Sequence, residues 1–102
     1  MISTGFIACA DFAEAKKIAS ALLDKRLIAC ANIAPEIHSF YWWKGKREEA
    51  KEALLIVKTR KKHARKIFAE VKKLHSYELP SMEFFEAETG RENEKWIKKE
   101  TK

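Results

Sequence analysis

The feature that most constrains this fold is a long extended run that ends in four aromatic residues and a turn. Residues 27–43 read LIACANIAPEIHSFYWW, and Lys44-Gly45 directly after them is a hairpin turn signal. Neighbouring strand residues point to opposite faces, so Phe40 to Trp43 puts aromatic surface on both sides of one strand. Pro35 within the run indicates a bulge or an edge position. The fold must therefore supply packing partners for both faces of this strand.

Three amphipathic helices are predicted around the extended segments. The first follows an Asp11 cap with Glu14 three residues later, as in a capping box, and ends near Lys25-Arg26. A third, shorter helix begins after Gly90 and carries Trp96 and Ile97 as apolar anchors. The apolar stripes of the first two helices recur at helical spacing and consist of Phe12, Ala15, Ile18, Ala19 and Leu22, and of Ala64, Ile67, Phe68, Val71 and Leu74.

The order of elements predicts an α+β, ferredoxin-like βαββαβ domain over residues 1–102, with an extra C-terminal helix. The other strands are expected at residues 2–9, 53–58 and 82–87. Residues 53–57 are apolar throughout, so both faces of that strand need cover. About 16 residues of strand span roughly 50 Å at ~3.3 Å per residue, whereas a first helix of about 15 residues spans only ~22 Å. The long hairpin therefore overshoots its own helices, and the available partner is another copy of the chain.

Charge and motif content argue against several classes of function. The net charge is +6, yet the dense basic run at residues 58–66 is more typical of a solvated helix face than of a binding patch. RNA binding is disfavoured because the third strand, ALLIVKT, lacks the aromatics on which an RNA-recognition fold stacks bases. We find no glycine-rich phosphate loop, nucleophile elbow or HExxH motif, which argues against an enzyme. No apolar stretch approaches a membrane span, and the N-terminus lacks a signal-peptide pattern, so a cytoplasmic location is expected.

The cysteines and histidines are the remaining candidates for chemistry. The predicted topology places Cys9 and Cys30 at opposite ends of the sheet, so no disulfide or shared site within one chain is expected. Cys30 alone is more often a packed core residue than a ligand. His63 is predicted to be exposed among cations and inert. The segment HSYELP, beginning at His75, combines imidazole and carboxylate donors that suit a metal or an anion, and it is equally compatible with hydrogen-bonded structure.

Four motifs together give a more specific indication. RLIACANIAP, SFYWWKGK, EALLIVKTR and LHSYELPSM occur in this order, and the sequence resembles the CutA family of divalent-cation tolerance proteins over nearly the whole chain. The resemblance implies a ferredoxin-like fold, a tight homotrimer built by long hairpins, and copper or another divalent cation as a ligand that the fold does not require. It implies no enzymatic activity. The trimer resembles that of PII signalling proteins, so small-ligand sensing, or a structural scaffold for protein interaction, is the alternative function.

The resemblance carries roles to individual residues. A metal set of thiol, imidazole and carboxylate is expected at Cys30, His75 and Glu78. The residues expected to line a cleft between subunits are Trp42, Glu52, Lys58, Tyr77 and Trp96, and those expected to form the trimer arm are Phe40, Tyr41 and Trp43. The family often has Glu before the turn glycine, where this chain has Lys44, so the cleft is a better metal candidate than the hairpin tip.

Overall fold

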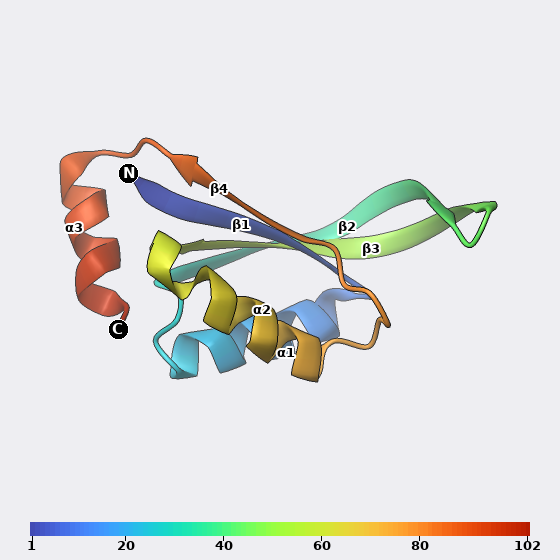
Figure 1. Cartoon of the computed structure of the whole chain (residues 1–102), viewed down its shortest axis with the longest axis horizontal. Helices are drawn as coiled ribbons and strands as arrows, with labels where there is room; N and C mark the ends of the chain where they lie inside the picture. Colours follow the sequence, from blue (N-terminus) through green and yellow to red (C-terminus); the bar gives the residue numbers. More distant parts are fainter.

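A computed structural model describes residues 1–102 and contains four strands and three α-helices (Figure 1). In chain order the elements are β1 (Ile2–Cys9), α1 (Phe12–Asp24), β2 (Cys30–Trp43), β3 (Lys46–Thr59), the short 3-10 helix η1 (Lys61–His63), α2 (Ala64–Leu74), β4 (Met82–Ala87) and α3 (Arg91–Glu100). The predicted order and class are confirmed. None of the helices is both long and apolar enough to cross a membrane.

The strands form one antiparallel sheet in the order β2-β3-β1-β4, which is the ferredoxin-like arrangement. Helices α1 and α2 lie side by side on one face of the sheet, and α3 lies at the end away from the hairpin turn (Figure 1). Because β4 runs antiparallel to β1, the chain leaving α2 must enter β4 beside the end of β1. In the register Met82 lies opposite Ile7. This crossing brings together the residues of the candidate site.

The core lies between the sheet and helices α1 and α2. Alternate residues of β3, from Ala53 to Val57, are fully buried, whereas Leu54 and Ile56 on the other face are only half-buried. One face of the apolar run in β3 therefore packs against helices α1 and α2. The other face is also apolar and is only partly covered. The cluster consists of Ile7, Cys9, Ala15, Ile18, Ala19, Leu22, Leu27, Ile28, Ala53, Leu55, Val57, Ile67 and Val71.

The far half of the β2–β3 hairpin, residues 37–51, extends beyond the helices, and we call it the arm (Figure 1). It begins at a bulge between Ala34 and Ile37, as Pro35 indicated. It ends in a turn with positive φ at both Lys44 (50°) and Gly45 (80°), the type I′ geometry that suits strand twist. The cross-strand register places Phe40 and Trp42 on one face and Tyr41 and Trp43 on the other, which confirms the predicted split.

Two expectations at the end of the fold opposite the arm are wrong. His63 is buried, not exposed, because it lies in the 3-10 turn before α2, where its ring faces the fold beside the Arg60 guanidinium. Trp96 is 42% exposed and does not anchor α3, whereas its neighbour Ile97 is fully buried. A helix this short buries one narrow stripe, so only one of two adjacent apolar residues can face inward.

Candidate functional site

The segment between α2 and β4, residues 75–81, crosses the end of the sheet, and we call it the strap. Its first residue, His75, has no exposed side-chain surface. Its ring Nε2 lies 2.7 Å from the carbonyl oxygen of Ala8 in β1, and its Nδ1 lies 3.0 Å from the backbone nitrogen of Tyr77. A carbonyl can only accept and a backbone N–H can only donate, so Nε2 carries the proton and Nδ1 presents its lone pair.

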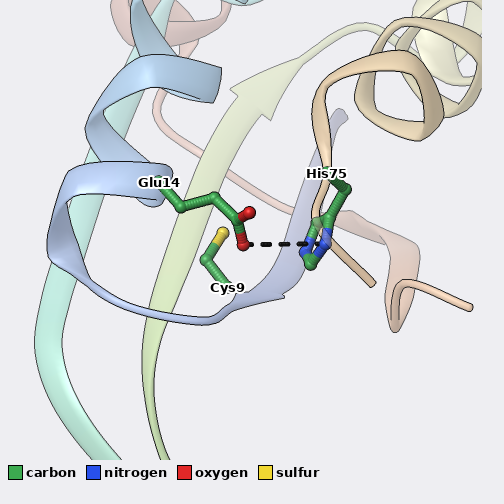
Figure 2. A group of neighbouring side chains, drawn as sticks. All are labelled: Cys9, Glu14 and His75. Atoms are coloured by element: carbon green, nitrogen blue, oxygen red, sulfur yellow. Dashed lines mark ion pairs between the residues drawn. The ribbon is translucent and has the colours of Figure 1, made fainter. Parts of the chain in front are cut away.

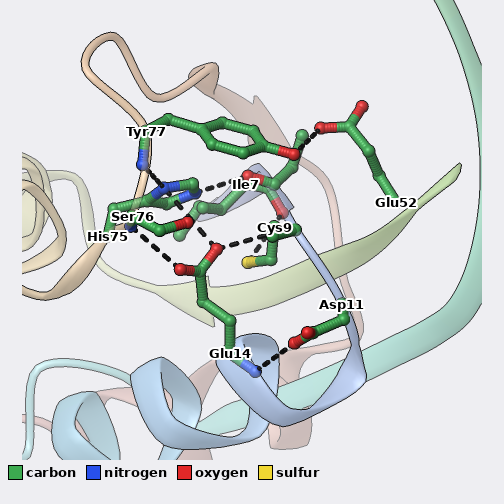
Figure 3. Close-up of polar contacts among 10 residues, drawn as sticks. Ile7, Cys9, Asp11, Glu14, Glu52, His75, Ser76 and Tyr77 are labelled. Carbon is green, nitrogen blue, oxygen red and sulfur yellow. Dashed lines mark hydrogen bonds and ion pairs between the residues drawn. The ribbon is translucent and has the colours of Figure 1, made fainter. Parts of the chain in front are cut away.

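Glu14 joins the strap to α1 (Figure 3). Its backbone N–H donates to Asp11 Oδ1 over 2.8 Å, which confirms the predicted N-cap. Its carboxylate accepts from the backbone N–H of Ala10 through Oε1 and from that of Ser76 through Oε2, each over 2.9 Å. Burial on its own raises the pKa of Glu14, but the hydrogen bonds from Ala10 and Ser76 outweigh it and leave that pKa below its usual value. The glutamate is therefore ionised at neutral pH.

Cys9, the last residue of β1, completes a cluster with Glu14 and His75 (Figure 2). Its thiol is fully buried and donates weakly to the carbonyl of Ile7 over 3.7 Å. Burial, followed by the negative charges of Glu14, Glu52 and Asp11, raises the pKa of this thiol to about 12. One donor atom from each of the three residues lies within 4.8 Å of the others, and Nδ1 of His75 is 3.6 Å from Oε1 of Glu14. Sulfur, nitrogen and oxygen donors thus converge in one protomer.

An open groove of about 1010 Å³ lies beside this cluster, between the arm and the strap. Tyr77 and Glu52 meet at its wall, where the tyrosine hydroxyl donates to Glu52 Oε2 over 2.7 Å (Figure 3). Burial and then this hydrogen bond raise the pKa of Tyr77 above its usual value. The groove is lined by Ala8, Ser39, Phe40, Tyr41, Trp43, Glu52, Ser76, Tyr77, Glu78, Leu79, Pro80, Ser81, Met82 and Glu83.

The structure does not bring Cys30, His75 and Glu78 together within one chain. In the register Cys30 lies opposite Lys58, whereas Cys9 lies opposite Ala53, so the two thiols are at opposite ends of the sheet as predicted. The Cys30 thiol donates weakly to Asn32 Oδ1 over 3.6 Å. The Glu78 side chain is 76% exposed and its closest cation, Lys44 Nζ at the hairpin tip, is 4.0 Å away. As a set contributed by different subunits, the three residues remain a prediction.

The other predicted cleft residues also divide between places. Tyr77 and Glu52 are in direct contact at the groove wall, whereas Trp42 is 71% exposed on the arm and does not line the groove. The residues predicted to form the trimer arm, Phe40, Tyr41 and Trp43, line it instead. Trp96 lines a separate, small pocket of about 280 Å³ at the α1–α3 end of the domain. Lys58 lies on β3 opposite Thr4 of β1. Only part of the predicted set therefore converges within one chain.

Sequence reasoning missed Cys9 and Glu14 as members of the site. The signal was available: β4 must begin beside the end of β1, so the residue that ends α2 must approach the residue that ends β1. Glu14, in the first turn of α1, lies at the same end of the sheet, because only two residues separate β1 from α1.

These features define a class of protein: a small ferredoxin-like domain whose long hairpin overshoots its helices and whose strap closes a polar cluster beside a groove. The chain belongs to the family of CutA1 divalent ion tolerance proteins, whose family profile matches residues 3–100. Divalent-cation tolerance protein CutA of Archaeoglobus fulgidus is 44% identical over 93 residues, 90% of each chain, and that of Pyrococcus horikoshii is 41% identical over the same shares.

Solved structures of such proteins superpose closely on this fold. The divalent cation tolerance protein (Cut A1) from Thermus thermophilus has a TM-score of 0.96 at 37% identity, with 100% of both chains covered. A structure described as the periplasmic divalent cation tolerance protein CutA from Archaeoglobus fulgidus has a TM-score of 0.93 at 40% identity, with 98% of both chains covered. The family resemblance inferred from the four sequence motifs is thereby confirmed.

Proposed function

We propose that this chain works as a homotrimer that binds a divalent cation, copper first among them, and catalyses no reaction. The observation that carries the proposal is the arm, which projects past the helices (Figure 1). The side chains of Phe40 and Trp42 on the arm are exposed, and Phe40 also lines the open groove. Aromatic surface of this extent is unfavourable in water and is typical of an interface. A neighbouring subunit that packs on the arm would close the groove at the same time.

The helix-free face of the sheet supports the same assembly. Leu54 and Ile56 of β3 are half-buried there, and Phe6 packs edge-on against Phe85, which is 47% exposed. An apolar sheet face without cover favours association over a monomer in solution. Two unpaired edge strands, β2 and β4, add backbone groups that a neighbour can use.

Divalent-cation binding is supported by family membership together with the donors around the groove. Glu52, Glu78 and Glu83 line it, and carboxylate oxygens are common ligands of divalent ions. Thiol and imidazole ligands favour copper over magnesium or calcium, and copper is also the tightest binder among the divalent first-row metals. Cys30 of one subunit would reach His75 and Glu78 only across an interface, which is the arrangement predicted from the sequence.

The decisive experiment combines native mass spectrometry with a calorimetric Cu²⁺ titration of the purified protein. We expect a mass of three chains and saturable copper binding. The double variant Cys30→Ser with His75→Ala should lose at least about tenfold in copper affinity, since each ligand or its support contributes on that scale. His38→Ala, a change at an exposed histidine of the arm, is the matched control. A monomer mass, or equal copper binding by the double variant, would contradict the proposal.

The size of the groove favours a second candidate, the sensing of a small ligand in the manner of PII proteins. About 1010 Å³ is at the upper end of the range for small-molecule sites and exceeds what a bare ion needs. If the occupant is an organic anion, binding should weaken with rising salt and ignore a chelator. Retention of a small molecule in native mass spectra after chelation would favour this alternative over the cation.

We also propose a cytoplasmic location, and the state of the thiols supports both this and the non-enzymatic part of the proposal. Cys9 is an inert nucleophile because its pKa is raised to about 12 and its sulfur is fully buried. Both cysteines are free, which suits a reducing compartment. The cytoplasmic location stays a prediction, to be checked by fractionation of the source cells.

A further inference from the structure

We propose that Cys9, Glu14 and His75 form a metal site within each protomer for a divalent cation that accepts thiolate, with Zn²⁺ as the type case. The inference rests on the proposed function and assigns divalent-cation binding to a second set of ligands, which lies within one protomer. The donor types are those predicted from the sequence, a thiol, an imidazole and a carboxylate. The structure supplies the thiol from β1 and the carboxylate from α1, where the sequence suggested Cys30 and Glu78.

The spacing of the donors suits one ion. All three ligand atoms lie within 4.8 Å of one another, and Nδ1 of His75 and Oε1 of Glu14 are 3.6 Å apart (Figure 2). In a tetrahedral zinc site with bonds of about 2.1 Å, two such ligand atoms are about 3.4 Å apart. Side-chain rotations that bring the donors closer, together with release of the Tyr77 N–H from Nδ1, therefore place the ion. Three protein ligands leave one position for water or another group, as in zinc sites that exchange a ligand.

The surroundings of His75 match those of a ligating histidine. Such a histidine usually donates its second ring N–H to a carbonyl or carboxylate, which fixes the orientation of the ring. Nε2 of His75 donates in this way to the Ala8 carbonyl. Nδ1 lies 3.6 Å from Glu14 Oε1, and in the metal-free protein its lone pair accepts the Tyr77 N–H (Figure 2). The Glu14 carboxylate is likewise held by the Ala10 N–H at Oε1 and the Ser76 N–H at Oε2, which fixes Oε1 3.6 Å from Nδ1 of His75. The site is thus oriented by its own backbone.

Charge also favours a divalent ion here. When a cation binds, the Cys9 thiol gives up its proton to solvent and its sulfur bonds the metal. The resulting thiolate and the Glu14 carboxylate carry two negative charges, which neutralise a divalent ion in a buried place. A monovalent or hard cation gains less, because sulfur and nitrogen ligands select softer metals.

Occupation of the site is coupled to the strap. The single lone pair on Nδ1 now accepts the Tyr77 N–H, so a metal at Nδ1 must displace that hydrogen bond. Tyr77 is also the residue whose hydroxyl contacts Glu52 in the groove wall. Metal binding therefore frees the Tyr77 backbone and changes the groove beside it. In the metal-free protein the Tyr77 N–H therefore occupies the position on Nδ1 that the ion takes when it binds.

The test uses Co²⁺ on the intact protein as a coloured substitute for Zn²⁺, with the two cysteines as a matched pair. We expect a thiolate-to-cobalt charge-transfer band that Cys9→Ala abolishes and Cys30→Ala leaves in place. Glu14→Gln should keep the band and weaken Co²⁺ affinity by about 10-fold or more, which covers the case in which Cys9→Ala does not fold. Zn²⁺ should speed hydrogen exchange at the Tyr77 amide at least several-fold.

The outcomes separate this inference from the proposed function. A band that survives Cys9→Ala or disappears with Cys30→Ala overturns the Cys9 site, and so does unchanged Co²⁺ affinity in Glu14→Gln. If copper still binds to a trimer in those cases, the proposed function stands without the inference. If neither Cu²⁺ nor Co²⁺ binds the intact protein, both fail. His38→Ala again serves as the control for non-specific imidazole binding.

Discussion

Both halves of the β2–β3 hairpin carry large apolar side chains, but one half buries them and the other exposes them. Leu55 and Val57 are fully buried under the helices, whereas Phe40 and Trp42 on the same pair of strands are 63% and 71% exposed. Helix α1 has 13 residues and the hairpin strands have 14 each. At 1.5 Å and about 3.3 Å per residue, these lengths are about 20 Å and about 46 Å. Burial here is decided by how far the helices reach.

The largest expected effect concerns the arm. Replacing Phe40 and Trp42 together with Asp should abolish assembly, because charge would replace aromatic surface on the face that we expect a neighbour to cover. Size-exclusion chromatography with light scattering should report the mass of one chain. The rest of the domain outside the arm, which we call the body, should stay folded, since neither residue belongs to its core.

The control places the same charge on the body. Phe12 is 49% exposed at the first position of α1, where an acidic residue suits the helix dipole. Phe12→Asp should leave the assembled mass unchanged. If both variants assemble normally, the arm is not the interface and its exposed aromatics need another explanation.

The second effect concerns the body and should appear in the free energy of unfolding. Leu55→Ala removes a fully buried side chain from the core and should cost about 2–5 kcal/mol. Leu23→Ala makes the same change on α1 at a position that is 42% exposed, and should cost well under about 1 kcal/mol. Urea unfolding of the two variants measures the difference. Equal losses would mean that the body does not carry the stability of the chain.

Most of the fold could be predicted from local patterns. The Asp11 cap, the helical stripes, the turn at Gly45 and the apolar segments fix the order of elements, and the length comparison of hairpin and helix identifies the arm. The bulge near Pro35 was also predicted, because proline removes a ladder hydrogen bond. These features depend on neighbours in the sequence, and so they can be derived from it.

The candidate site could be predicted only in part. His75 and Tyr77 stand in a distinctive segment, and the structure places Tyr77 in the groove wall and His75 in the buried cluster beside it. Their partners Cys9 and Glu14 are over 60 residues away in the chain and carry no local motif, so they are found only by tracing the strap across the sheet. His63 was misjudged for a similar reason. A run of cations suggests an exposed face, yet the turn before α2 directs that one ring inward.

The smallest expected effect is a pH dependence at His63, at the end of the body opposite the arm. Burial, then the positive charges of Arg60, Lys62 and Lys66, lower the pKa of His63 below its ordinary value of 6.5. As the pH falls below 6.5, the unfolded chain takes up a proton that the folded chain resists. The stability contributed by neutral His63 is therefore complete above that pH and is lost as the pH falls toward the lower folded pKa.

Urea unfolding of the metal-free protein at pH 7.5 and pH 5.0 measures this loss, and His63→Gln should reduce it. His38→Gln removes an exposed imidazole and should leave it unchanged. The window lies above the ordinary carboxyl range, so the lowered pKa values of Glu14, Glu70 and Glu94 act only at lower pH. If the loss persists in His63→Gln, another group is responsible for it. If the assembly dissociates at pH 5.0, the responsible group lies on the arm.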